Sequence, residues 1–196
     1  MFRKYLVIFL VIILVACTGS PVPSPTPSSE QLDSEEQAVY AELLQKLYAT
    51  SSYVIMDTTA TSPSGVEDTD STLDLIVQDM RAVDQQTVDS FRDRNDAAHS
   101  IRPDMDLGSA YVLLSQVEMS RIFSQNQDGW QVFYDRYPDA PGIINLSRVG
   151  FNNGLDQALV YVGTMSHWLA GSGYYVLLKK VNGSWLVDQQ VMTWIS

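Results

Sequence analysis

Residues 173–187 read GYYVLLKKVNGSWLV, and this stretch decides the fold of the C-terminal half of the chain. Asn182-Gly183 is the strongest hairpin signal present, because a two-residue type I′ turn needs positive φ at both of its positions. The runs on either side, residues 173–181 and 184–189, are rich in β-branched and aromatic residues, which favour strands. We therefore expect an antiparallel hairpin here, followed by a last strand over residues 191–195.

Two further strands are expected just upstream of this hairpin. Residues 143–150 and 157–163 are the expected strands, and they lie on either side of Asn152-Asn153-Gly154, which is a turn signal. Residues 164–171 read TMSHWLAG, and because glycines flank them closely we expect a flexible loop there. Consecutive strands joined by tight turns predict an antiparallel meander.

The N-terminal half shows helical spacing instead. Ser34 and Gln37 form a capping box, and the apolar residues that follow recur every three or four positions. Further helices are expected at residues 72–83, after Asp84, from Ser115 and at 130–137, and short strands at 52–59 and 110–114. Helices first and strands after them predict an α+β fold, in which a helical N-terminal half packs on one face of a C-terminal antiparallel β-meander.

The first sixteen residues have the pattern of an export signal. Arg3 and Lys4 are followed by an uninterrupted apolar stretch over residues 5–16. A membrane-spanning helix needs about 20 apolar residues, whereas the core of a signal peptide needs about 7–15. We therefore expect residues 1–16 to be a signal peptide.

Leu14-Val15-Ala16-Cys17 resembles the lipobox of bacterial lipoproteins, and Cys17 is the only cysteine of the chain. The resemblance implies diacylglyceryl transfer to the Cys17 thiol, cleavage before Cys17 and further acylation, for example with palmitate. The mature protein would then be held on the extracytoplasmic side of the cell membrane or outer membrane by its acyl chains. The alternative is an ordinary secretory signal in which Cys17 has no role.

Residues 17–30 are expected to form a tether, and residues 31–196 a single α+β domain. The tether contains Pro21, Pro23, Pro25 and Pro27 and almost no apolar side chain that could be buried. Such a segment is extended, at about 3.1 Å per residue. It would therefore separate the domain from the membrane by up to roughly 35 Å.

The strand segments carry a second resemblance. SRVGFN (147–152), QALVYVG (157–163), GYYVLLKKVNGSW (173–185) and WIS (194–196) together resemble the C-terminal half of a group of uncharacterised bacterial secreted proteins and lipoproteins. This family has no assigned activity, so the resemblance implies a bacterial envelope protein and no catalytic residue.

Charge and composition exclude several function classes. The chain has 12 Lys and Arg against 23 Asp and Glu, a formal charge of −11 in 196 residues. This balance argues against nucleic-acid partners, which are bound through Lys and Arg. A single cysteine excludes an internal disulfide framework and a cysteine-cluster metal site. No P-loop, GxGxxG or GxSxG motif is present, and we expect no cofactor and no metal.

Two groups of residues are candidates for a site. His167 and Trp168 lie in the expected Gly-flanked loop, where an exposed aromatic residue suits ligand binding. The alternative is that Trp168 packs back onto the helical layer. His99, Asp104 and Asp106 could form a His/carboxylate site between helices and sheet.

These observations favour a lipid-anchored cell-envelope protein that serves as a binding or interaction module. Its expected partners are the membrane, through the lipid on Cys17, and an envelope protein, a glycan or a small-molecule ligand. The alternative is an envelope hydrolase that uses the His/carboxylate residues. A third interpretation is an assembly factor without a small-molecule site.

Overall fold

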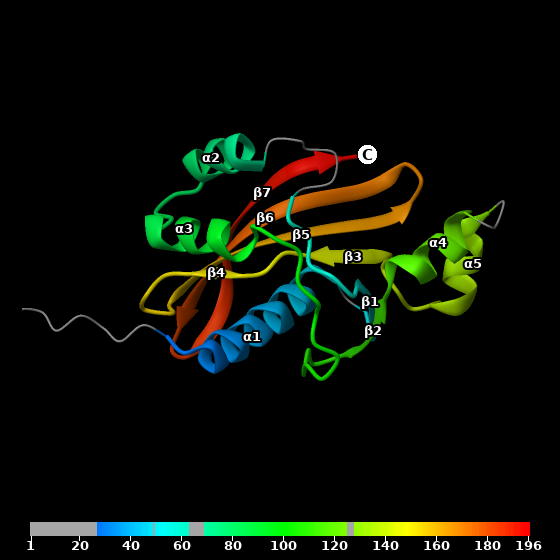
Figure 1. The fold of residues 1–196 in the computed structure, drawn as a ribbon, viewed down its shortest axis with the longest axis horizontal. Coiled ribbons are helices and arrows are strands. Elements are labelled where there is room, and N and C mark those ends of the chain that lie inside the picture. Colours follow the sequence, from blue (N-terminus) through cyan, green and yellow to red (C-terminus); the bar gives the residue numbers. More distant parts are fainter. Residues whose placement is uncertain (1–26, 49, 63–68, 125–127) are drawn as a thin grey trace, which may run out of the picture.

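A computed structural model describes residues 27–48, 50–62, 69–124 and 128–196, so the predicted signal peptide, Cys17 and most of the tether lie outside the described residues. The elements form one sheet with helices packed against it (Figure 1). In chain order they are α1 (Ser29–Leu47), β1 (Ser52–Met56), α2 (Thr69–Asp79), α3 (Gln85–Arg94), β2 (Ala110–Leu114), α4 (Gln116–Ser124), α5 (Gly129–Arg136), β3 (Ile143–Leu146), β4 (Gly150–Phe151), β5 (Gln157–His167), β6 (Ala170–Val181) and β7 (Ser184–Ile195).

The sheet is mixed, with strand order β2-β1-β3-β5-β6-β7, and β4 pairs separately with β5. The predicted α+β class and the antiparallel β5–β7 meander are confirmed. The sheet also recruits β1 and β2 from the helical half, because β1 pairs in parallel with both β2 and β3. Parallel pairs need long crossover connections, and here helices supply them: α2 and α3 lie between β1 and β2 in the chain.

Helices cover both faces of this sheet, so the expectation of one covered face is wrong. Val160 of β5 packs with α1, whereas its neighbour Leu159 packs with α2 and α3 on the opposite face. Nearer the β1 end of the sheet, Val54 and Ile143 pack with α4 and α5. The sequence of β5 accounts for this arrangement. Its first seven residues are all buried, and after Gln157 they form a continuous apolar run, which is the pattern of a strand covered on both faces.

Helix α1 begins earlier than its sequence pattern predicted. Ser28 is the N-cap, and its hydroxyl accepts a hydrogen bond from the backbone N–H of Gln31 at 3.2 Å. The predicted start at Ser34 is wrong, because Leu32 already packs against the core and the extra turn partly buries it. The last two residues of the predicted tether, Ser29 and Glu30, are therefore helical.

The two hairpins of the meander differ in how well they were predicted. Asn182 and Gly183 have φ values of 52° and 84°, which confirms the type I′ turn between β6 and β7. The flexible loop expected at residues 164–171 is wrong, because β5 and β6 stay paired up to His167 and Ala170. Only Trp168 and Leu169 remain in the turn.

The glycines of this segment explain the difference. A Cβ at Gly173 would lie 2.1 Å from Nε1 of Trp194, and one at Gly171 would lie 2.8 Å from the same indole ring. Glycines in a strand often mark the close approach of another group. Here they let the Trp194 side chain lie flat on the sheet, where its Nε1 donates to the Tyr161 hydroxyl at 2.8 Å.

Within the described residues, no helix has both the length and the apolar composition needed to cross a bilayer.

Candidate functional site

The far end of the β5–β6 hairpin carries both residues predicted for ligand binding. His167 ends β5, and Trp168 opens the two-residue turn. Trp168 is 54% exposed and Leu169 82% exposed, while Met165 is 39% exposed on the adjoining strand. The tip of the hairpin thus presents apolar side chains to solvent.

Trp168 also contacts the helical layer, as the alternative interpretation proposed. Its ring meets Phe123 of α4 edge-on at 5.6 Å and Trp130 of α5 at 6.4 Å. His167 stacks on Trp130, with ring centroids 6.2 Å apart and planes 20° apart. The hairpin tip is therefore held against α4 and α5 while about half of the Trp168 surface stays open.

A groove of about 460 Å³ lies beside this tip, on the α1 face of the sheet. We call it the hairpin groove. Its lining comes from the end of α1 and from the three long strands: Leu47, Tyr48, Thr164, Ser166, Ala170, Gly171, Ser172, Tyr174, Gln190, Ile195 and Ser196. None of these side chains is acidic or basic. Its volume falls within the range of about 300–1,000 Å³ that is usual for small-ligand sites.

Tyr48 fixes the α1 wall of the groove. Its hydroxyl hydrogen-bonds to the Thr164 hydroxyl, and its ring meets Tyr53 edge-on at 6.3 Å. Burial raises the pKa of Tyr48 to about 12, although the hydrogen bond to Thr164 works in the opposite direction. The phenol therefore stays protonated over the physiological pH range.

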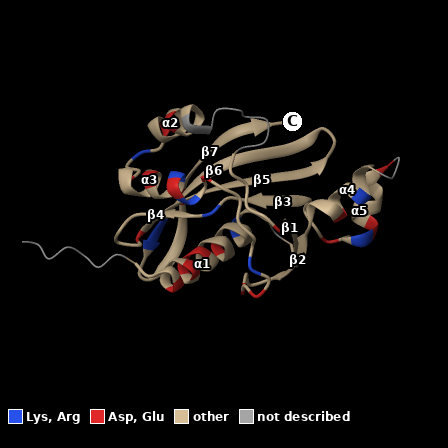
Figure 2. Ribbon diagram, in the orientation of Figure 1, with Lys and Arg blue, Asp and Glu red and all other residues tan. Residues whose placement is uncertain are grey.

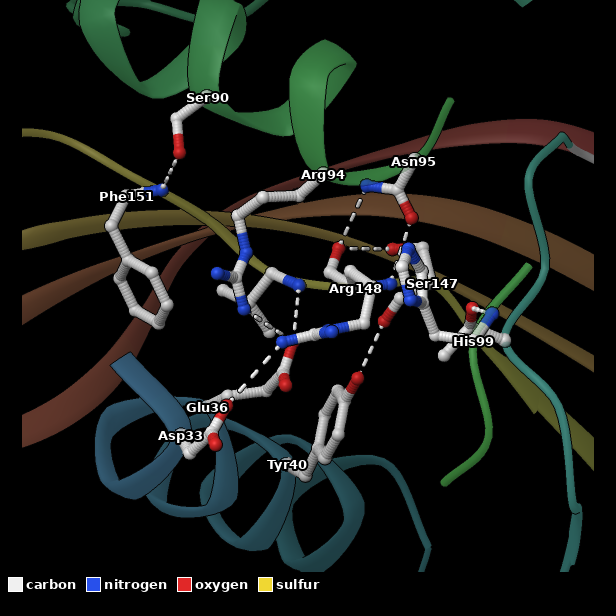
Figure 3. Close-up of polar contacts among 12 residues, drawn as sticks. Asp33, Glu36, Tyr40, Ser90, Arg94, Asn95, His99, Ser147, Arg148 and Phe151 are labelled. Carbon is white, nitrogen blue, oxygen red and sulfur yellow. Dashed lines mark hydrogen bonds and ion pairs between the residues drawn. The ribbon is translucent and has the colours of Figure 1, made fainter. Parts of the chain in front are cut away.

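A charged cluster lies in the first half of α1, around Glu36 (Figure 3). Glu36 Oε1 accepts hydrogen bonds from the backbone N–H of Val149 at 2.8 Å, Arg148 Nε at 2.9 Å and Arg94 at 3.2 Å. The donors come from α3 and from the connection between β3 and β4. We call this cluster the Glu36 clamp, because it ties three segments together.

Two further contacts complete the clamp. The Tyr40 hydroxyl donates to the Ser147 carbonyl at 2.7 Å, and Asn95 bridges the end of α3 to the backbone of Arg148. Burial, followed by the charge of Glu36, raises the pKa of Tyr40 well above its usual value. Burial alone would lower the pKa of Arg148, but its hydrogen bond and attraction to Glu36 outweigh this and raise it. These contacts hold α1, the end of α3 and the connection between β3 and β4 together, which is a structural role.

The His/carboxylate candidates are not brought together. His99 is exposed, and only its backbone is engaged, in two hydrogen bonds with Thr59. Asp106 caps a turn by accepting from the Gly108 N–H at 3.0 Å. Between the described residues, no hydrogen bond or ion pair joins the His99 ring to Asp104 or Asp106. No group of three His, Cys, Asp or Glu side chains in the described part of the chain is placed to hold a metal ion.

The groove residues themselves were not predicted from the sequence. One signal could have found them: residues 157–178 contain no Asp, Glu, Lys or Arg, although the chain has 35 such residues. Burial in the core does not account for the whole of this charge-free run, because part of the run forms the exposed hairpin tip.

No family model, curated protein or solved structure matches this chain.

Proposed function

We propose that this chain is a lipid-anchored binding module of the bacterial cell envelope. Its sequence supports an anchor at Cys17 and a spacer after it. One structural observation carries the binding part of the proposal: the exposed hairpin tip and the hairpin groove lie at the end of the domain opposite to the start of α1.

Helix α1 relates the two ends. Near its start, Glu35 accepts a hydrogen bond from Trp185 Nε1 at 2.8 Å and pairs with Lys180, beside the β6–β7 turn. Just past its end, Tyr48 contacts Thr164 in the groove. Nineteen helical residues span about 28 Å at 1.5 Å each. The described chain accordingly enters at one end of the molecule, and the β5–β6 tip lies at the other (Figure 1).

This arrangement suits a module that reaches away from its membrane. A tether joined to the start of α1 would place that end nearest the bilayer and turn the hairpin tip outward. The net charge supports a domain that stands off from the membrane, because loss of residues 1–16 leaves 10 basic against 23 acidic residues, a formal charge of −13. Such a domain is repelled by anionic lipid.

The anchor is tested by replacing Cys17 with Ser in intact bacteria fed a labelled fatty acid. We expect the wild-type chain to carry label and to sediment with membranes, and Cys17→Ser to lose both properties. Thr18→Ser is the matched control and should behave as wild type. Unchanged labelling of Cys17→Ser would contradict the anchor.

The binding surface is tested with a photo-cross-linking residue at one of two exposed positions. Leu169 lies at the hairpin tip, whereas Val181, 48% exposed, lies beside the β6–β7 turn at the opposite end. We expect irradiation of intact cells to give a cross-linked envelope product from position 169 and none from position 181. Equal products from both positions, or none from 169, would contradict the proposed surface.

A further inference from the structure

We propose that the hairpin groove binds an uncharged oligosaccharide. This inference rests on the proposed binding function and names the ligand class of the same site. Three properties of the groove carry it. Its lining has no charged side chain, it offers hydroxyl and amide groups that have no hydrogen-bond partner among the described residues, and two tyrosine rings belong to its lining.

No charged side chain lies on the strands where they run beside the groove. The arms of the β5–β6 hairpin show no Lys, Arg, Asp or Glu along residues 157–178, and neither does β7 after Asp188 (Figure 2). A charged ligand would lose hydration on entering the groove without gaining an ion pair with a lining side chain. An anionic ligand would in addition meet the negative field of a chain with a net charge of −11. Both effects favour an uncharged ligand.

The polar groups of the groove are available for a ligand. Across the described residues, no hydrogen-bond partner is present for the side chains of Ser172, Tyr174 and Gln190. Ser172 pairs directly with Thr164, and Tyr174 is two residues further along the same face of β6. Ser166 donates to the Ala170 carbonyl at 3.1 Å, which leaves its oxygen free to accept. Hydroxyls and an amide therefore line one surface and can both donate and accept.

The same groups disfavour a purely apolar ligand. Covering several hydroxyls and an amide without replacing their hydrogen bonds to water is unfavourable, because each covered group is then left without a partner. A saccharide avoids this cost, because its own hydroxyls both donate and accept. It also has a face of C–H groups that packs on an aromatic ring, and Tyr174 lies in the groove for such a contact. The hydrogen bond and ring contact of Tyr48 hold the opposite wall in place before a ligand arrives.

The test is calorimetric titration of the full lipidated chain in detergent micelles. The probes are neutral trisaccharides of glucose or N-acetylglucosamine, and a trisaccharide of galacturonic acid serves as the charged comparison. Each is titrated to about 10 mM, which fills a site of even millimolar affinity. We expect at least one neutral trisaccharide to bind and the acidic one not to bind.

Two groove variants assign the binding to this site. Ser172→Ala and Gln190→Ala each remove one polar group whose side chain makes no hydrogen bond within the described residues, and each should weaken the bound trisaccharide about fivefold. Ser184→Ala and Gln116→Ala, at exposed positions outside the groove, are the matched controls and should leave the Kd unchanged. Tyr174→Phe, which keeps the ring, should weaken binding to a similar extent.

Two outcomes would overturn the inference: no heat with any neutral trisaccharide, or groove variants that bind as tightly as wild type. Either result, together with specific cross-linking from position 169, would leave the proposed binding function standing with a different ligand. Conversely, the chain could bind a neutral trisaccharide while its Cys17→Ser variant still sediments with membranes. That pair of results would support the groove and contradict the anchor. The two proposals therefore fail separately.

Discussion

At the scale of single residues, Glu36 shows how a carboxylate in an acidic chain becomes structural. One of its oxygens receives three hydrogen bonds, two of them from arginines whose side chains are only about one-fifth exposed. Removing one partner of a buried ion pair costs roughly 3–5 kcal/mol, and the remaining contact with water lowers this here. We expect Glu36→Gln to lower the free energy of unfolding by about 2–3 kcal/mol in urea titrations. Glu30→Gln, on the exposed first turn of α1, should change it by less than about 0.5 kcal/mol.

Gly173 illustrates the opposite case, in which the absence of a side chain matters. A methyl group there would lie 2.1 Å from Trp194 Nε1 and 2.7 Å from the Tyr161 hydroxyl, so it would push the indole off the sheet and break their hydrogen bond. We expect Gly173→Ala to destabilise the fold by about 1–3 kcal/mol and to alter tryptophan fluorescence in the folded state. Gly154→Ala is the control, because its nearest contact would be an ordinary 3.5 Å. Equal stability of the two variants would show that Trp194 does not pack this closely.

Tyr48 makes stability depend on alkaline pH. Burial raises its pKa to about 12 in the folded chain, from an ordinary value of 10.0. The unfolded chain therefore releases this proton first, and the stability that the buried phenol provides is present below pH 10.0 and lost as the pH rises toward about 12. Tyr48→Phe should remove about 2–3 kcal/mol of the loss measured by urea unfolding across that interval. Tyr40 contributes in the same direction, so the comparison is the difference between variant and wild type. An identical alkaline slope in both proteins would contradict the assignment.

At the scale of elements, the hairpin tip separates packing from binding. Trp168 makes ring contacts with Phe123 and Trp130, each worth about 0.5–1.5 kcal/mol, whereas Leu169 is 82% exposed. We expect Trp168→Ala to lower the free energy of unfolding by about 1–2 kcal/mol and Leu169→Ala to change it by less than about 0.5 kcal/mol. Thermal and urea unfolding measure both effects. If Trp168→Ala were as stable as wild type, the ring would not stabilise the contact between the hairpin tip and helices α4 and α5.

The sequence predicted elements best where a local signal decides the backbone. Asn182-Gly183 dictates its turn, Asp84 caps α3 by accepting from Gln86 N–H, and Ser115 caps α4 by accepting from Glu118 N–H. It failed where distant residues decide. Gly171 was assigned to a loop, because no residue near it in the chain indicates that Trp194 packs over it.

The same limit applies to pairing and to the site. Parallel partners for β1 lie far away in the chain, so the pattern of each strand does not reveal its neighbour. Glu36 meets Arg148 across 112 positions, and the groove joins the end of α1 to three strands. The fold does not bring together the candidate residues that were chosen by type, such as His99 and Asp104. It places residues without any catalytic character, such as Ser172 and Gln190, in one groove.

At the scale of the whole molecule, the sheet makes the two halves of the sequence one folding unit. Strand β3 lies between β1 from the first half and β5 from the second, and a Cβ at Gly150 would lie 2.4 Å from the backbone of Phe91. Neither half can bury its apolar surface alone, which is the condition for cooperative unfolding. We therefore expect one urea transition. In a chain that keeps only Trp185, and in one that keeps only Trp130, the midpoint by fluorescence should coincide with the midpoint of that same chain by far-ultraviolet circular dichroism. These tryptophans report on opposite ends of the domain, Trp185 at the Glu35 contact and Trp130 beneath the hairpin tip. Separate midpoints would mean that the α4–α5 end unfolds on its own, and the hairpin tip would then rest on a support that can open independently of the sheet.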